Sequence, residues 1–176
     1  MKWANLLYEI SNNSDNQIST ELLELIHTTN RIFLTGSGRS GLALKAFEMR
    51  LSQLGKSVFF IGDTNTPAID SEDLLIVASS SGETSQLINY ADISKNIGSK
   101  IWLWSTNSNN TIYEKADYFT LLAGKSKFSN SSLTQQPMGS LFEQSVWIYG
   151  DLFVINYMNY YDITESELKQ RHANLE

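Results

Sequence analysis

Residues 74–84 of the chain, LLIVASSSGET, place a run of apolar side chains directly before a cluster of hydroxyl side chains. A continuous apolar run of this length is typical of a strand that is buried on both faces of a parallel sheet. From Thr84 to Asn96 the sequence has the pattern of a helix, which is expected to end at Gly98. A strand, a short polar turn and a helix in this order indicate one unit of a parallel α/β sheet.

The same alternation continues on both sides of this stretch. Strands are expected at 31–35, 58–61, 74–78, 100–104 and 118–121, and the helices between them at 40–54 and 84–96. These elements predict the α/β class, with a doubly wound five-stranded parallel sheet flanked by helices. We expect one domain over residues 1–176, with N-terminal helices at 1–29 and the α/β core at 30–122.

Two helices are expected before the core. The apolar residues within 6–10 predict a short first helix. Ser14 or Asp15 is expected to cap a second helix, which runs to about Thr28. The apolar side of the second helix would face the core.

The chain after the core divides into a loop, a long helix and a tail. Residues 124–137 are polar and serine-rich, which predicts a loop that is mobile or covers a ligand. The next helix, from about Met138 to Tyr161, is apolar almost all round. Such a helix is normally buried on more than one side, and in a chain this short the second side is most simply another subunit. A last helical turn at 166–170 leads into the tail at 171–176.

The composition argues against several classes of protein. The chain has 176 residues, a net charge of −6 and no cysteine. An acidic chain without a basic patch is a poor match for a nucleic-acid partner. The absence of cysteine fits a reducing compartment, so we expect a cytoplasmic protein. The apolar stretch at 144–161 contains Asp151 and two asparagines, and a membrane span is therefore not expected.

The hydroxyl cluster at 79–84 suits the binding of a phosphate. Ser79, Ser81 and Thr84 would supply hydrogen-bond donors, and Gly82 permits close approach of the backbone. The N-terminus of the following helix adds unpaired N–H groups and a partial positive charge. The alternative is simple helix capping, with Ser81 as the N-cap and Thr84 at the third helical position. Capping accounts for one or two of these hydroxyls but not for the whole run.

A second strand–helix turn, at 36–41 (GSGRSG), matches the G-x-G-x-x-G pattern of dinucleotide-binding proteins, and Asp63 follows the next strand. Against that interpretation, the chain has little room for a separate substrate domain. The hydroxyl cluster also lies on a neighbouring strand, which suits a sugar phosphate. Arg39 and Ser40 would then contact phosphate or substrate oxygens. The plainer alternative is a tight turn with a solvated arginine.

Glu143 is the one charged residue near the start of the long apolar helix. Partial removal of its carboxylate from water would make it a stronger base, suited to proton transfer near neutral pH. A carboxylate in the first turn of a helix is also favoured by the macrodipole alone. Taken by itself, the residue leaves both interpretations open.

The remaining titratable residues have plainer interpretations. His27 lies late in an amphipathic helix, where a structural role is favoured, and His172 lies in a polar tail, where a histidine is usually solvated. Asp151, inside the apolar helix, is expected to have a structural hydrogen-bond partner. Histidine and carboxylate residues nowhere show the spacing of metal ligands, so no metal is predicted.

Taken together, these motifs resemble the sugar isomerase (SIS) family. Residues 79–84 (SSSGET) are similar to the phosphate loop of that family, and 36–40 (GSGRS) to its first strand–helix turn. Within the family, the likeness is greatest to isomerases of phosphorylated hexuloses. It is carried by 38–41 (GRSG), 138–143 (MGSLFE) and 171–176 (RHANLE), and extends over essentially the whole chain.

The resemblance implies a flavodoxin-like three-layer α/β/α fold and a homotetramer with its sites near the subunit interfaces. The implied reaction converts D-arabino-hex-3-ulose 6-phosphate into fructose 6-phosphate without a cofactor. Glu143 would be the base, His172 would move protons among the substrate oxygens, and Arg39 would stabilise the enediolate. The residues implied to bind the phosphate are Ser40, Ser79, Ser80, Ser81, Gly82 and Thr84. Gly38 and Glu83 would contact other parts of the substrate.

Two other functions stay open. A different isomerase of the same family would act on another phosphorylated sugar with the same kind of site. A sensor of phosphorylated sugars would need the phosphate loop but no base for proton transfer, so Glu143 and the tail favour an enzyme.

Overall fold

The computed structural model describes residues 2–11, 17–125 and 134–175. Its strands are β1 (Arg31–Gly36), β2 (Ser57–Phe60), β3 (Leu74–Ala78), β4 (Lys100–Ser105) and β5 (Tyr118–Leu121). Its helices are α1 (Trp3–Ser11), α2 (Thr20–Thr28), α3 (Arg39–Gln53), α4 (Ser85–Ile97), α5 (Ser140–Tyr160) and α6 (Glu165–Gln170), with the short 3-10 helix η1 (Tyr113–Lys115).

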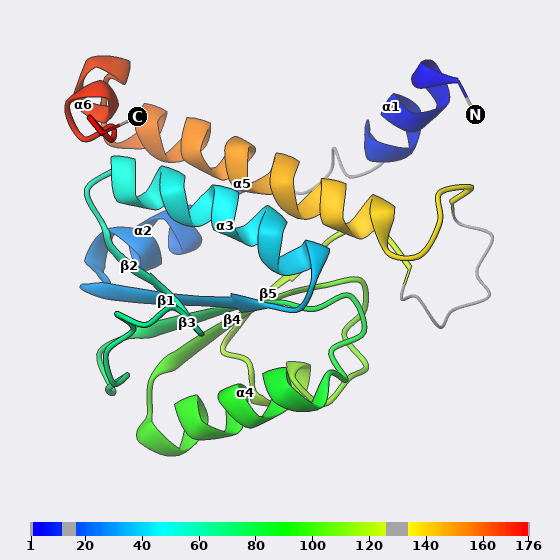
Figure 1. Cartoon of the computed structure of the whole chain (residues 1–176), viewed down its shortest axis with the longest axis horizontal. Coiled ribbons are helices and arrows are strands. Elements are labelled where there is room, and N and C mark those ends of the chain that lie inside the picture. The colour runs from blue at the N-terminus through cyan, green and yellow to red at the C-terminus, as the bar shows by residue number, and fades with distance from the viewer. Residues whose placement is uncertain (1, 12–16, 126–133, 176) are drawn as a thin grey trace.

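The strands of the described residues form one parallel sheet in the order β2-β1-β3-β4-β5 (Figure 1). The expected doubly wound five-stranded sheet is thereby confirmed, and its order is that of flavodoxin-like folds. The strand order switches direction between β1 and β3, where Gly36 pairs with Ala78. The loops after these two strands therefore begin side by side at the carboxyl edge of the sheet, where open α/β sheets bind ligands.

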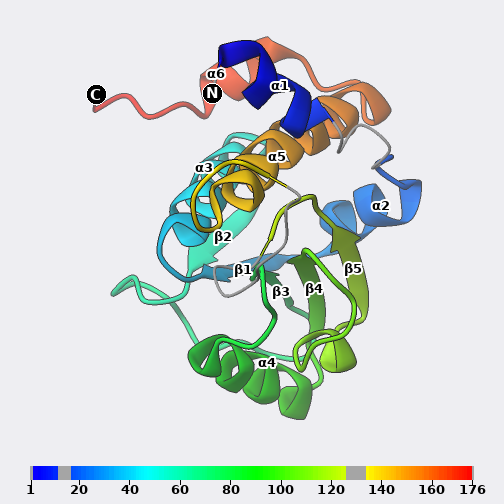
Figure 2. The same ribbon diagram turned by 90° about the vertical axis from the view of Figure 1, so that its right-hand side faces the viewer.

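Helices cover both faces of the sheet. α4 lies on one face, and α3 and α5 lie next to each other on the opposite face (Figures 1 and 2). The side of α3 and α5 holds the larger core, in which Trp102 and Trp104 are fully buried. α3 and α5 approach closely because Gly150 faces Phe47: a Cβ atom at Gly150 would lie 3.1 Å from that side chain. Since the two helices run in the same direction, their N-terminal ends come together (Figure 1).

One helix before the core begins later than expected. α2 starts at Thr20, because the side chain of Ser19 accepts a hydrogen bond from the backbone N–H three residues further on and caps the helix. The caps predicted at Ser14 and Asp15 lie outside the described residues. The loop predicted at 124–137 also lies largely outside them, since 126–133 are not described.

α5 is shorter than expected, and one side of it is exposed in the single chain. It begins at Ser140, because Met138 has a φ of 56° and so cannot be part of the helix. Trp147 is 51% exposed and Ile155 is 56% exposed, so the described part of the chain covers this side of the helix only in part. Asp151 forms an ion pair with Arg50 at 3.9 Å in place of the expected buried hydrogen bond. In the parts of the chain that are described, no helix has the length and apolar character needed to cross a membrane.

Candidate active site

The hydroxyl cluster forms the loop between β3 and α4. Ser79 Oγ accepts a hydrogen bond from the Gly82 N–H at 3.1 Å, and Ser81 Oγ accepts one from the Glu83 N–H at 3.2 Å. Each hydroxyl uses its oxygen as an acceptor and keeps its own proton for donation. The loop therefore offers O–H donors to a ligand, whereas these two backbone N–H groups are already used.

The helices that begin at this edge of the sheet differ from the others at their N-termini. α2 and α6 are capped by the side chains of Ser19 and Thr164. By contrast, the N-cap residues of α3, α4 and α5 are Gly38, Thr84 and Gly139, and among the described residues none of them makes a side-chain capping bond. Thr84 is thus the N-cap of α4, and the alternative with Ser81 in that role is wrong. First-turn N–H groups without a side-chain cap suit an anion.

Ser80 adds a polar atom without a partner to the same loop. Its Oγ is one of the few buried side-chain polar atoms in the described residues that have no hydrogen-bond partner. Its carbonyl oxygen, in contrast, accepts hydrogen bonds from Ser105 Oγ at 3.2 Å and Thr106 Oγ1 at 2.7 Å. A buried hydroxyl without a hydrogen-bond partner destabilises the fold unless a ligand or water supplies the missing hydrogen bond. Ser80 therefore supports a polar ligand at this loop.

Gly82 cannot be replaced in this loop without strain. Its φ is 68°, and a Cβ atom would lie 1.9 Å from Asn110 Oδ1. Asn110 has little room to move, because it is 6% exposed and its side chain donates to the Asn107 carbonyl at 2.7 Å and accepts from the Tyr113 N–H at 2.9 Å. The glycine is therefore required by close packing between two loops.

We expect Gly82→Ala to weaken sugar phosphate binding and to destabilise the fold by about 1–3 kcal/mol, because a strained φ and a steric clash act together. Thermal denaturation and titration with fructose 6-phosphate measure both effects. Gly62→Ala is the matched control, because Gly62 has a φ of 109° but open space at the Cβ position. Equal losses in the two variants would show that contact with Asn110 is unimportant.

The second turn, after β1, is shaped by close packing of a helix on a strand. A Cβ atom at Gly41 would lie 2.3 Å from the Gly36 carbonyl oxygen, which explains the glycine at this position. Gly38 has a φ of 58° and precedes α3, and Ser40 lies half-buried in the first turn of that helix. Because Gly36 pairs with Ala78 at the ends of β1 and β3, this turn and the hydroxyl loop share one edge of the sheet.

The geometry after β2 does not favour a dinucleotide. In that class of protein an acidic residue after the second strand binds the ribose. Asp63 occupies this position here, but both of its carboxylate oxygens accept hydrogen bonds from Lys45, at 2.9 and 3.2 Å. Asp63, the residue that would bind the ribose, is therefore already paired with Lys45.

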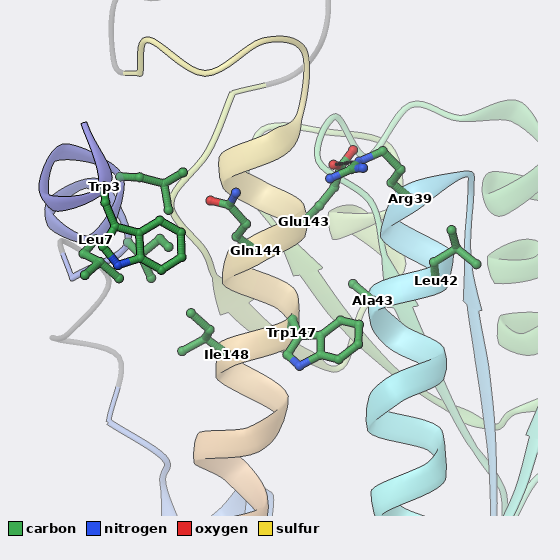
Figure 3. A pocket seen from close by; sticks show the side chains of 11 residues that line it. Trp3, Leu7, Arg39, Leu42, Ala43, Glu143, Gln144, Trp147 and Ile148 are labelled. Carbon is green, nitrogen blue, oxygen red and sulfur yellow. Dashed lines mark hydrogen bonds and ion pairs between the residues drawn. The ribbon is translucent and has the colours of Figure 1, made fainter. Parts of the chain in front are cut away.

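Arg39 and Glu143 form an ion pair across the N-terminal ends of α3 and α5 (Figure 3). Arg39 Nε donates to Glu143 Oε2 at 2.5 Å, although the two residues are far apart in the sequence. Glu143 keeps only 15% of its side chain exposed, whereas Arg39 keeps 69%. The hydrogen bond to Glu143, together with its charge, raises the pKa of Arg39. The largely buried carboxylate of Glu143 is thus paired with a cation. This pairing was not predicted from the sequence.

A largely apolar cavity of about 610 Å³ lies between α1, α3 and α5, and this ion pair forms part of its wall. Trp3, Leu42 and Trp147 line it and stay at least half exposed (Figure 3). Such walls do not suit a sugar phosphate, which needs polar partners, but they do suit another apolar protein surface. The polar side of the site is therefore the edge that holds the hydroxyl loop.

His172 is not brought to Glu143 within one chain. The neighbouring Arg171 donates to the Gln53 carbonyl oxygen at 3.4 Å, at the C-terminal end of α3. Arg39 lies at the opposite end of this helix, about 21 Å away by the helical rise. His172 is exposed, and its Nδ1 lies 3.0 Å from the carbonyl oxygen of the next residue. Figure 1 shows α6 and the C-terminus at the end of α5 that is remote from Ser140.

Sequence reasoning missed the loop that supports the hydroxyl cluster. Residues 105–111 (STNSNNT) begin at the last residue of β4 and contact the cluster through Ser105, Thr106, Asn110 and Thr111. Their signal was a polar run directly after a buried strand, the same signal that marked residues 79–84. Among the described residues, no group of histidine and carboxylate side chains could hold a metal ion.

These features define an α/β protein with a hydroxyl-rich loop, whose donors suit an anion, at the topological switch point of its sheet. Comparison with known proteins extends this result. The sequence profile of the SIS domain matches residues 25–143. The chain therefore belongs to the SIS domain family.

Several relatives resemble the chain over most of its length. It is 34% identical to the 3-hexulose-6-phosphate isomerase of Bacillus subtilis, over 98% of this chain and 96% of the relative. It is 38% identical to the enzyme of the same name from Mycobacterium gastri, over 83% and 74%. A crystal structure from Methanococcus jannaschii, described as inferring a 3-hexulose-6-phosphate isomerase function, superposes with a TM-score of 0.83 at 33% identity and covers 98% and 96% of the two chains.

Proposed function

We propose that the protein is a 6-phospho-3-hexuloisomerase, which interconverts D-arabino-hex-3-ulose 6-phosphate and D-fructose 6-phosphate. The observation that carries the proposal is the Arg39–Glu143 pair beside the phosphate-binding edge. A base and a cation held together at one point are the groups that an enolisation needs. Similarity to several proteins named 3-hexulose-6-phosphate isomerase supports the choice of substrate.

Glu143 performs both proton transfers at carbon in this mechanism. Its carboxylate takes the proton from C2 of the 3-ketose, and the electron pair of that C–H bond forms the C2=C3 double bond of a cis-enediolate. The protonated carboxyl then returns the proton to C3, and the carbonyl forms at C2. One carboxylate suffices, because the two carbons are adjacent and both can be reached from the same face of the planar intermediate.

Arg39 stabilises the negative charge that develops on the enediolate oxygens. Its guanidinium is 69% exposed and can turn from Glu143 to a substrate oxygen. A cation near the developing charge stabilises the enediolate-like transition state more than it stabilises the neutral ketose, and so lowers the barrier. The ion pair thus holds both groups in place until substrate separates them.

The phosphate binds at the hydroxyl loop, far enough from the reacting carbons to act only as an anchor. The O–H groups of Ser79, Ser80 and Ser81 donate to its oxygens, together with the first-turn N–H groups of α4. Ser40, in the first turn of α3, donates from the opposite side. Neutral donors suffice here, because the N-terminus of a helix already carries partial positive charge.

His172 acts from a second copy of the chain, since it lies too far from Glu143 in its own. It moves the hydroxyl proton between O2 and O3 while Glu143 acts at carbon. The exposed apolar side of α5, with Trp147 and Ile155, supports close packing of subunits in a homotetramer.

The direct test supplies the 3-ketose and measures the formation of fructose 6-phosphate. A second enzyme converts fructose 6-phosphate into the substrate of an oxidoreductase, whose turnover is followed. Steady turnover supports the proposal. A protein that binds fructose 6-phosphate but never forms it would be a sensor. A thermal shift with NAD but not with fructose 6-phosphate would instead point to a dinucleotide site.

A further inference from the structure

Glu83 belongs to the hydroxyl loop by sequence, but its side chain faces the neighbouring loop. Its Oε1 accepts a hydrogen bond from the Thr111 N–H at 2.7 Å, and its Oε2 accepts one from Thr111 Oγ1 at 2.8 Å. Both carboxylate oxygens are thus held by one residue of the loop that follows β4. This pairing fixes the carboxylate in two directions at once.

A carboxylate beside a phosphate site needs such a partner. Two like charges a few ångströms apart repel each other, and a free Glu83 would weaken the binding of an anionic ligand. Hydrogen bonds from an N–H and an O–H group to an ionised carboxylate are stronger than bonds between neutral groups. The two hydrogen bonds from Thr111 thus keep the Glu83 carboxylate next to Thr111 and stabilise its negative charge.

Other hydrogen bonds join the same two loops on either side of Glu83. The Ser80 carbonyl oxygen accepts from Thr106 Oγ1 at 2.7 Å, and the Gly82 carbonyl oxygen accepts from the Ile112 N–H at 3.3 Å. The hydroxyl loop is therefore fastened to the loop after β4 at several points. The contact of Glu83 is the one that uses a charged side chain.

We propose that Glu83 is a positioning residue that holds the phosphate loop in shape through Thr111, and not a contact of the substrate as the family resemblance implies. The inference rests on the proposed function, because the loop must bind the phosphate of the substrate. Glu83 also donates its N–H to Ser81 Oγ, so fixing its side chain sets the direction in which this hydroxyl points. Donors that are ordered before binding lose less entropy when the ligand arrives.

Two variants at Glu83 separate positioning from contact. Glu83→Gln keeps both links to Thr111, because the amide oxygen still accepts from the N–H while the amide nitrogen donates to the hydroxyl. We expect its Kd for fructose 6-phosphate to stay within about twofold of the unchanged protein, whereas Glu83→Ala raises it about tenfold through loss of both bonds. The effect on kcat should be smaller than that on KM. Tighter binding by Glu83→Ala would overturn the proposal, because it would mean that the carboxylate only repels the ligand.

A double-mutant cycle with Thr111→Val tests the link itself. Thr111→Val removes the hydroxyl donor but keeps the N–H, so on its own it should weaken binding less than Glu83→Ala does. In the Glu83→Ala background the same change should have almost no further effect, because its partner is gone. Fully additive losses would overturn the proposal, since they would show that the two residues act independently on the ligand.

Glu114→Ala is the control for lost negative charge, because Glu114 is an exposed glutamate in the same region. It should leave the Kd unchanged, and circular dichroism should show every variant to be folded.

Binding measured by calorimetry distinguishes failure of the Glu83 proposal from failure of the proposed function. A protein that binds fructose 6-phosphate without turnover would refute the isomerase while the cycle still tests Glu83. A protein that binds neither fructose 6-phosphate nor inorganic phosphate would overturn both.

Discussion

Glu143→Gln should reduce isomerisation by about a thousandfold or more, because the amide cannot accept the proton from C2 of the 3-ketose. The change preserves the size of the side chain, and its amide oxygen can still accept a hydrogen bond from Arg39 Nε. Binding of fructose 6-phosphate should therefore remain within a few-fold of the unchanged protein, since the phosphate loop is untouched. The measurements are kcat from the coupled assay and Kd from calorimetry.

Asp151→Asn is the matched control for this experiment. Asp151 lies on the same helix as Glu143, and it too is paired with an arginine of α3, through Arg50 at 3.9 Å. It lies two turns further along α5 and is half exposed, so its loss should leave kcat unchanged. Near-normal turnover by Glu143→Gln would remove this residue from the role of base. Equal losses in both variants would indicate disturbed packing of α3 against α5.

His172→Ala should lower kcat by about a hundredfold with little change in phosphate binding, if a second chain delivers this ring to Glu143. Removal of residues 172–176 should have at least the same effect. Such a truncation must keep Arg171, because its guanidinium donates to the Gln53 carbonyl oxygen at 3.4 Å and so contacts the end of α3. His27→Ala serves as the comparison, because His27 stacks on Tyr161 at the far end of α5.

Mixed oligomers show which chain supplies His172. Glu143→Gln and His172→Ala are each expected to be nearly inactive, but a site that takes Glu143 from the His172→Ala chain and His172 from the Glu143→Gln chain holds both intact groups. Co-expression should therefore restore activity to about a quarter of the normal level if chains assort at random. A mixture that stays inactive, while both variants assemble, would show that the tail does not act across a subunit interface.

Strands were easier to predict than the starts of helices. The strands Leu74–Ala78 and Tyr118–Leu121 were predicted from short apolar runs, because a strand buried in a sheet appears in the sequence as consecutive apolar residues. α4 starts one residue later than expected, since the hydroxyls of Ser79 and Ser81 bond to N–H groups within the loop and not to the first turn of the helix. Competition between local hydrogen bonds of this kind does not show in hydrophobic patterns.

Contacts between distant residues explain what the sequence could not show at the site. Arg39 and Glu143 were both singled out, but their pairing depends on how α3 packs against α5, which in turn depends on Gly150. Thr111 gave no signal of its own, and its role appears only when the loops after β3 and β4 lie together. The distance of His172 from Glu143 likewise follows from the length of α3, and the proposed mechanism therefore requires a second chain to supply this ring.

The most direct test of the account is to incubate the protein with fructose 6-phosphate in D₂O and to locate the deuterium by NMR. A proton taken from C3 and returned by way of a 2,3-enediolate predicts deuterium at C3 and the appearance of the 3-ketose, with C1 unchanged. Deuterium at C1 with none at C3 would contradict the account, because it would mean a 1,2-isomerisation to an aldose phosphate. Binding of fructose 6-phosphate with neither exchange at C3 nor formation of the 3-ketose would contradict it as well, and would leave a protein that senses the sugar phosphate.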